Sequence, residues 1–200
     1  MDTRSLRLVA IGDELLAGHG DPRGLGWFGR VLARTPSDQV QLEPYVLASP
    51  KETTEELAGR WLGEAQQRFD PDGANRVVVA LSTADEEHGV STARSRLNLA
   101  NILDAATQLS LSAFVVGPPP TLDPERNKRI SQLSTAFGDV TTRRNHFYVD
   151  TFTPLEGHEQ FRADLAAHRG VPSQQGHGLI AWLVLHRGWY PWLGITEPEE

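Results

Sequence analysis

Short apolar runs alternate with longer amphipathic segments along the whole chain. The short runs are rich in β-branched and aromatic residues, as buried β-strands typically are, and cover residues 6–11, 40–48, 77–81, 113–116 and 147–149. The longer segments have the apolar spacing of helices and cover residues 25–33, 52–69, 91–109, 123–137 and 173–186. This alternation predicts an α/β fold, a three-layer α/β/α sandwich around a parallel five-stranded sheet.

The composition indicates a single domain, residues 1–200. The 200 residues are 39 % hydrophobic, which is enough for one sizeable core, and no linker-like stretch divides the chain. The chain has no cysteine, which fits the reducing cytoplasm, where we expect this protein. No apolar leader precedes the first strand, and the longest late apolar run, residues 179–185, is too short to span a bilayer. We therefore expect no membrane span.

The charge pattern disfavours a nucleic-acid partner. The formal net charge is -7, and the Lys and Arg residues are scattered instead of forming a basic stripe that would face a phosphate backbone.

Four short segments carry the most information about function. They are residues 12–15 (Gly-Asp-Glu-Leu), 50–54 (Pro-Lys-Glu-Thr-Thr), 81–85 (Leu-Ser-Thr-Ala-Asp) and 171–177 (Val-Pro-Ser-Gln-Gln-Gly-His). In order and spacing they resemble the motif blocks of the SGNH or GDSL hydrolases, a family of esterases and lipases, and the resemblance covers nearly the full chain. It implies a flavodoxin-like sheet with the site at the carboxyl ends of the strands.

Each block differs from the family at the residue that performs the chemistry. The family uses a serine nucleophile, an oxyanion hole built from that serine, a second-block glycine and a third-block asparagine, and a histidine oriented by an aspartate. The resemblance places other residues at these positions. Glu14 stands for the serine, Lys51 for the glycine, Ala84 for the asparagine, His168 for the aspartate and Val171 for the histidine. A chain without nucleophile, base and asparagine has no route to acyl transfer by this mechanism.

These replacements predict a pseudoenzyme that binds a small ligand or a protein partner in the cleft where its relatives bind esters. The alternative is an ester hydrolase that uses rearranged groups at the same cleft. The candidate cleft residues are Asp13, Glu14, Lys51, Ser82, Asp85 and His168. We also expect the Lys51 ammonium to reach toward the Glu14 carboxylate, because the two positions are neighbours in the family.

Other arrangements of catalytic groups remain open. Asp164 and His168 form a displaced acid and base pair if the loop before Pro172 contains an insertion. Carboxylates gathered at one rim can divide acid and base roles or, with a nearby histidine, bind a divalent cation. Their spacing matches no ligand motif with a defined mechanism, so we expect neither a metal ion nor a cofactor.

The tryptophans are expected in structural roles. Trp27, Trp61 and Trp182 fall in helical segments, where packing against the sheet is the default. The cluster near the C-terminus either closes over the sheet edge or forms an apolar patch through which the chain self-associates; its members are Trp189, Tyr190 and Trp192.

Overall fold

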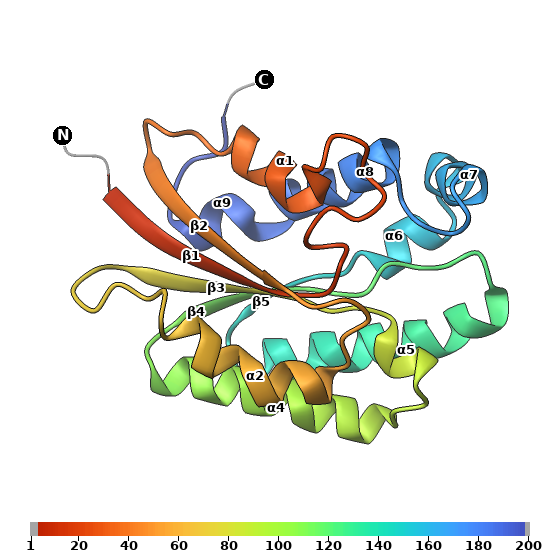
Figure 1. Ribbon diagram of the computed structural model, residues 1–200, viewed down its shortest axis with the longest axis horizontal. Helices are drawn as coiled ribbons and strands as arrows, with labels where there is room; N and C mark the ends of the chain where they lie inside the picture. The colour runs from red at the N-terminus through yellow and green to blue at the C-terminus, as the bar shows by residue number, and fades with distance from the viewer. Residues whose placement is uncertain (1–3, 199–200) are drawn as a thin grey trace.

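Five parallel strands form one sheet between two layers of helices (Figure 1). The computed structural model describes residues 4–198. The strands are β1 (Arg4–Gly12), β2 (Val40–Ala48), β3 (Asn75–Ala80), β4 (Ser112–Val116) and β5 (Phe147–Val149). Their order across the sheet is β2-β1-β3-β4-β5, and every neighbouring pair is parallel. The predicted three-layer sandwich with a parallel five-stranded sheet is confirmed.

Alternate side chains of each inner strand build two separate cores. In β1, Leu8 and Ala10 face a layer that contains α1 (Gly26–Arg34), α8 (Gln174–Val184) and α9 (Tyr190–Leu193). Val9 and Ile11 face the opposite layer, which contains α2 (Thr54–Ala65), α4 (Thr92–Gln108) and α5 (Pro124–Thr142). Figure 1 shows the first layer above the sheet and the second below it. This two-sided burial explains why the strands are continuously apolar.

Local capping decides where several helices begin. Thr53 and Glu56 form a capping box at the start of α2, and Asp123 accepts hydrogen bonds from the first main-chain N–H groups of α5. Ser173 precedes α8 as expected, but its side chain makes no capping bond. The predicted helix over residues 173–186 ends as a regular helix at Val184, and the chain continues through a kinked turn (Leu185–Trp189) into α9.

Four helices of the described residues were not predicted from the sequence. They are α3 (Ala84–Glu87), α6 (Phe152–Glu156), α7 (Glu159–Ala167) and α9. The helices α3, α6 and α9 are about one turn long, too short for an apolar period to emerge, and α7 shows only a weak apolar stripe. Within residues 4–198, no helix has both the length and the apolar character that crossing a membrane requires.

Most of the tryptophans lie in the core. Trp27 and Trp61 are buried, as predicted. The expectation for Trp182 is wrong, because its side chain is 51 % exposed and contacts the ring of His186 on the outer face of α8. The apolar residues of this helix cover more than one face, so the spacing alone did not identify the solvent side.

The aromatic cluster near the C-terminus packs inward. Trp189, Tyr190 and Trp192 are all buried, and the rings of Trp189 and Trp192 lie 5.4 and 5.1 Å from that of Phe114 in β4. These side chains thus close over the sheet, the first of the two expected roles. Self-association of the chain stays a prediction, and it would need another surface.

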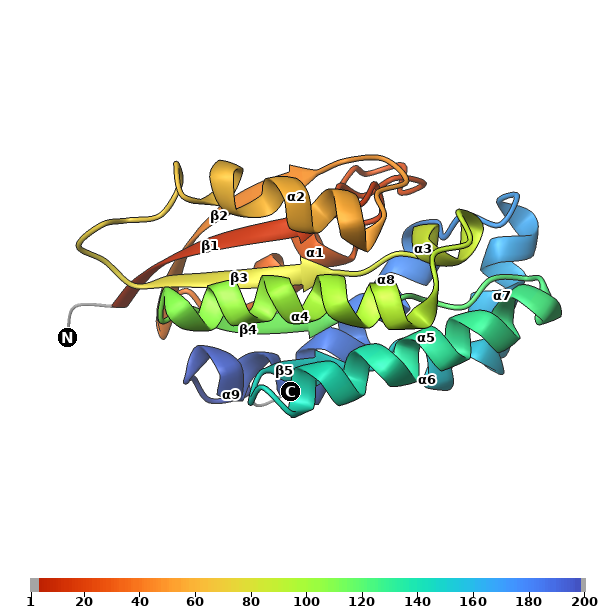
Figure 2. The ribbon, with the colours of Figure 1, turned by 90° about the horizontal axis from the view of Figure 1, so that it is seen from below.

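The topology leaves a crevice at the carboxyl ends of the strands. The chain leaves β1 toward β2 on one side, and the later strands add on the other side, so the switch point lies between β1 and β3. In Figure 2 the strand arrowheads point toward the end of the molecule that carries α3 and α7. Gly12 permits close approach here, since a Cβ on it would lie 2.6 Å from the main-chain oxygen of Ala80.

Candidate functional site

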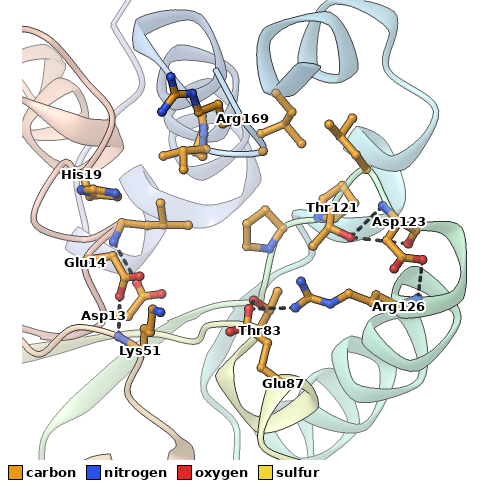
Figure 3. A pocket seen from close by; sticks show the side chains of 18 of the residues that line it. Asp13, Glu14, His19, Lys51, Thr83, Glu87, Thr121, Asp123, Arg126 and Arg169 are labelled. Carbon is orange, nitrogen blue, oxygen red and sulfur yellow. Dashed lines mark hydrogen bonds and ion pairs between the residues drawn. The ribbon is translucent and has the colours of Figure 1, made fainter. Parts of the chain in front are cut away.

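A cavity of about 550 Å³ opens at this crevice. Its walls come from the loops after β1, β2 and β4, from α3, from the start of α5 and from the segment between α7 and α8 (Figure 3). The charged and histidine side chains that line it are Asp13, Glu14, His19, Lys51, Glu87, Asp123, Arg126 and Arg169. The cavity therefore presents both positively and negatively charged groups to a ligand.

Glu14 and Lys51 meet on one wall of this cavity. The Glu14 Oε2 atom accepts a hydrogen bond of 2.6 Å from the main-chain N–H of Lys51. The two residues are neighbours, as expected, but the contact uses the main chain of Lys51 and not its ammonium. Within residues 4–198 the Lys51 ammonium has no carboxylate within 4.0 Å.

The backbone of Lys51 explains the direction of its N–H. Its φ is +53°, in the left-handed region that favours glycine, and the resemblance places a glycine at this position. Lys51 therefore adopts a backbone conformation that suits the glycine which the resemblance implies at this position.

Asp13 lies beside Glu14 and is shielded from water. Its side chain is buried, and Oδ1 accepts a hydrogen bond of 3.0 Å from the Leu15 main-chain N–H. Burial, together with the negative charge of Glu14, raises the pKa of the Asp13 carboxyl to about 7, against the opposing effect of its hydrogen bonds. Both protonation states of Asp13 are therefore populated near neutral pH.

The opposite wall carries groups that the sequence analysis did not single out. Glu87 on α3 accepts hydrogen bonds from Arg126 Nη2 at 2.8 Å and from Thr83 Oγ1 at 3.0 Å, and Figure 3 shows this triplet across the cavity from Glu14. Arg169 lies on the α7–α8 segment and has no ion-pair partner among the described residues. No motif marks these positions, because they come together only when α3, α5 and α7 pack.

Ser82 and Asp85 lie near the cavity but do not line it in the described part of the chain. Ser82 Oγ donates to the main-chain oxygen of Glu52 and accepts from the N–H of Ala84. The buried Asp85 carboxylate accepts hydrogen bonds from the N–H and Oγ1 of Thr54, at 2.7 and 2.6 Å. These bonds hold the start of α2 against the loop after β3. Ala84 is also buried and has no side-chain donor.

Asp164 and His168 are in contact, but outside the cavity walls as described over residues 4–198. His168 Nδ1 lies 2.8 Å from the main-chain oxygen and 3.2 Å from Oδ1 of Asp164. The Asp164 carboxylate also accepts from the Ser173 hydroxyl and from the N–H groups of Ser173 and Gly176, at 2.8 and 2.9 Å. It thereby caps α8, and the cavity wall beside it is formed by Val171.

The histidine of the last motif block, His177, is engaged in the fold. His177 is fully buried; its Nδ1 accepts from the N–H of Trp27, and its Nε2 lies 2.8 Å from the main-chain oxygen of His19. Burial lowers its pKa, which favours the neutral ring. Over residues 4–198, no three His, Asp or Glu side chains are grouped so that they could hold a metal ion.

Comparisons with known proteins give one match to a family model over most of the chain. The family model described as "GDSL-like Lipase/Acylhydrolase family" matches residues 10–179. No curated protein sequence matches the chain significantly.

Several solved structures share the fold. A variant of Axe2, an acetyl-xylooligosaccharide esterase from Geobacillus stearothermophilus, has a TM-score of 0.76 at 18 % identity, with 100 % of both chains covered. A member of the lipolytic G-D-S-L family from Veillonella parvula has a TM-score of 0.74 at 16 % identity, covering 90 % of this chain and 96 % of the other. The psychrotrophic esterase EstA from Pseudoalteromonas sp. has a TM-score of 0.70 at 17 % identity, covering 94 % and 98 %.

Proposed function

Because this chain belongs to the GDSL-like lipase/acylhydrolase family, we propose that it is a member with a degenerate site, which binds a small polar ligand in the cavity without hydrolysing esters. One observation carries this proposal. The Glu14 carboxylate accepts a hydrogen bond from the Lys51 N–H, and the resemblance assigns Glu14 to the nucleophile position and this N–H to the oxyanion hole. A negative carboxylate on that donor opposes the negative charge that acyl transfer develops there.

The surrounding residues support the same conclusion. Val171, which the resemblance assigns to the position of the family's base, lines the cavity, and its hydrocarbon side chain accepts no proton. The Asp164 carboxylate, which would have to orient His168, is already bonded to the start of α8. Each group of the family's triad is thus replaced or otherwise engaged.

The cavity is suited to a small molecule. A volume of about 550 Å³ falls within the range of roughly 300–1,000 Å³ that is usual for ligand sites. The Lys51 ammonium and the Arg169 guanidinium line it, and neither forms an ion pair with a described residue. A ligand with an acyl or sugar oxygen can accept hydrogen bonds from these groups.

Two measurements test the proposal. In a p-nitrophenyl acetate assay, we expect the wild-type protein and Glu14→Ala to hydrolyse the ester no faster than buffer alone. Turnover by the wild type that Glu14→Ala abolishes would overturn the loss of catalysis. In thermal melts with acetylated xylo-oligosaccharides, chosen because a structural neighbour is an esterase for them, we expect a saturable rise in Tm.

A matched pair of variants locates the binding. Arg169→Gln, in the cavity wall, should reduce the ligand-induced shift, whereas Arg162→Gln, an exposed position on α7 that does not line the described cavity, should leave it unchanged. No shift with the wild type, or equal shifts in both variants, would overturn binding of this ligand class at the cavity.

Asp13 favours a second candidate, an ester hydrolase with rearranged groups. A carboxyl with a pKa of about 7 beside another carboxylate is an arrangement that can divide acid and base roles. This candidate predicts ester turnover that titrates near pH 7 and is lost in Asp13→Asn. The same assay, run from pH 5 to pH 9, therefore separates the two functions.

A further inference from the structure

A second cavity lies at the opposite end of the strands, where β1, β3 and β4 begin. It has a volume of about 350 Å³ and is lined by Arg4 of β1, Arg76 of β3, Ser112 of β4 and the loop residues 73–75 and 109–111. In Figure 2 this is the end of the molecule near the N-terminus, far from α3 and α7. The cavity is therefore separate from the site proposed above.

Arg76 carries an unusual guanidinium. The side chain is half-buried, and its Nε atom is buried without a hydrogen-bond partner among the described residues. Its Cζ lies 5.4 Å from the centre of the Trp192 ring, whose Nε1 donates a hydrogen bond of 2.9 Å to Ser112 Oγ. The Arg76 guanidinium therefore lies over the Trp192 ring at a cation–π distance.

The local charge is positive although the chain as a whole is negative. The net charge is -7, yet Arg4 and Arg76 line this cavity together, and neither has a carboxylate within 4.0 Å in the described part of the chain. Burial, with the charge of Arg4, lowers the pKa of the Arg76 guanidinium. A half-buried donor beside a like charge costs stability, and an anion between the two arginines would offset both effects.

We propose that the cavity between Arg4 and Arg76 binds a phosphate group. Arg76 lines the cavity, and the terminal N–H groups of an arginine are donors that suit the oxygens of a phosphate. Arg4, on the neighbouring strand β1, supplies the second positive charge. Two cations attract a doubly charged phosphate more strongly than a singly charged carboxylate.

Calorimetric titration of inorganic phosphate into the full chain tests this site, with chloride keeping the ionic strength constant. We expect saturable binding that Arg76→Gln and Arg4→Gln each weaken by about tenfold or more, the loss of one charge-assisted contact. Acetate at the same concentrations should bind more weakly than phosphate. Arg162→Gln is the control for general charge, because that exposed arginine lies on α7 and lines neither cavity over residues 4–198.

Arg169→Gln distinguishes this site from the first cavity. Phosphate binding that survives Arg76→Gln but disappears in Arg169→Gln would overturn the proposal, as would acetate binding as tight as phosphate or no binding by the wild type. Removal of the unpaired charge should not unfold the protein, and a thermal melt of Arg76→Gln without phosphate checks that the variant is folded. Titrations with glucose 6-phosphate and AMP then show whether the phosphate group belongs to a sugar phosphate or a nucleotide, since the preferred molecule binds more tightly than inorganic phosphate.

Discussion

The Glu14 carboxylate accepts a hydrogen bond of 2.6 Å from the main-chain N–H of Lys51. One residue follows β1 and the other follows β2, so the bond joins the two loops that flank the carboxyl end of the first strand pair. The main-chain N–H of Lys51 therefore already has an internal acceptor. The bond stabilises the loops and removes a donor from the cavity in one step.

The substitution Glu14→Ser alone should not create an esterase. We expect Glu14→Ser to hydrolyse p-nitrophenyl acetate no faster than wild type, because Val171 still supplies no base and Ala84 no oxyanion donor. One missing oxyanion donor typically costs about 10²–10³ in kcat, and groups of a triad act as a unit. The variant to compare it with is the triple variant, which adds Ala84→Asn and Val171→His to Glu14→Ser. Substantial turnover by Glu14→Ser alone would mean that a base lies elsewhere in the cavity, with His19 the first residue to test.

The left-handed backbone at residue 51 gives a prediction about stability. Lys51→Gly should be more stable than Lys51→Ala by about 0.5–1 kcal/mol, since only glycine has no steric cost at a φ of +53°. Both variants keep the N–H that Glu14 accepts. Urea unfolding curves measure the difference, and an alanine variant as stable as the glycine variant would show that this backbone carries no strain.

The strands and most of the longer helices were predictable from the sequence, and the one-turn helices were not. β2 and β5 have the predicted bounds, and the cores follow the alternation of side chains along each strand. The helices α3 and α6 are one turn long and depend on tertiary contacts, for example the hydrogen bond from Thr54 to Asp85 at the start of α3. Short segments of this kind carry too few apolar positions to define a period.

The site was predictable where it follows the motif blocks. Asp13, Glu14 and Lys51 line the cavity because each follows directly on a strand of the parallel sheet. The main-chain contact between Glu14 and Lys51 was not predictable, since a motif identifies side chains and not the φ angle of residue 51. Arg169 was missed for another reason: it faces the cavity only because α7, a helix absent from the sequence prediction, packs beside α8.

Asp13 should make stability depend on pH in a specific direction. Its pKa is raised from 3.8 to about 7 on folding, so the folded protein holds this proton more tightly than the unfolded chain. The stabilising effect of the group is complete below pH 3.8 and is lost as the pH rises through about 7. Asp13→Asn, which keeps an acceptor for the Leu15 N–H, should therefore gain stability relative to wild type between pH 5 and pH 8.

We expect that relative gain to be on the order of 2 kcal/mol, because each pKa unit corresponds to about 1.4 kcal/mol. Urea unfolding of both proteins at the two pH values measures it, and the difference between them cancels the other titrating groups. Asp38→Asn, at an exposed position, is the control and should follow wild type at both pH values. Equal stability differences at pH 5 and pH 8 would mean that the Asp13 carboxyl titrates with an ordinary pKa.

Asp164 and His168 are in contact, and substitutions at the two residues distinguish a structural pair from a catalytic pair. Asp164 is buried, and its carboxylate accepts from two N–H groups at the start of α8, whereas the His168 side chain is about half exposed. Asp164→Ala leaves those N–H groups without their acceptor in a buried place, so it should lower the free energy of unfolding by about 2–3 kcal/mol. His168→Ala removes only an exposed partner and should cost less than about 1 kcal/mol.

Thermal melts and ester assays on both variants distinguish the two roles. A structural pair gives this unequal loss of stability and no change in p-nitrophenyl acetate hydrolysis in either variant. A displaced acid and base pair would instead give ester turnover in the wild type that His168→Ala abolishes at nearly unchanged Tm. Since the Asp164 carboxylate is already bonded to Ser173 and Gly176, it cannot turn toward the cavity without uncapping α8. The capping role therefore predicts that stability, and not activity, responds to this residue.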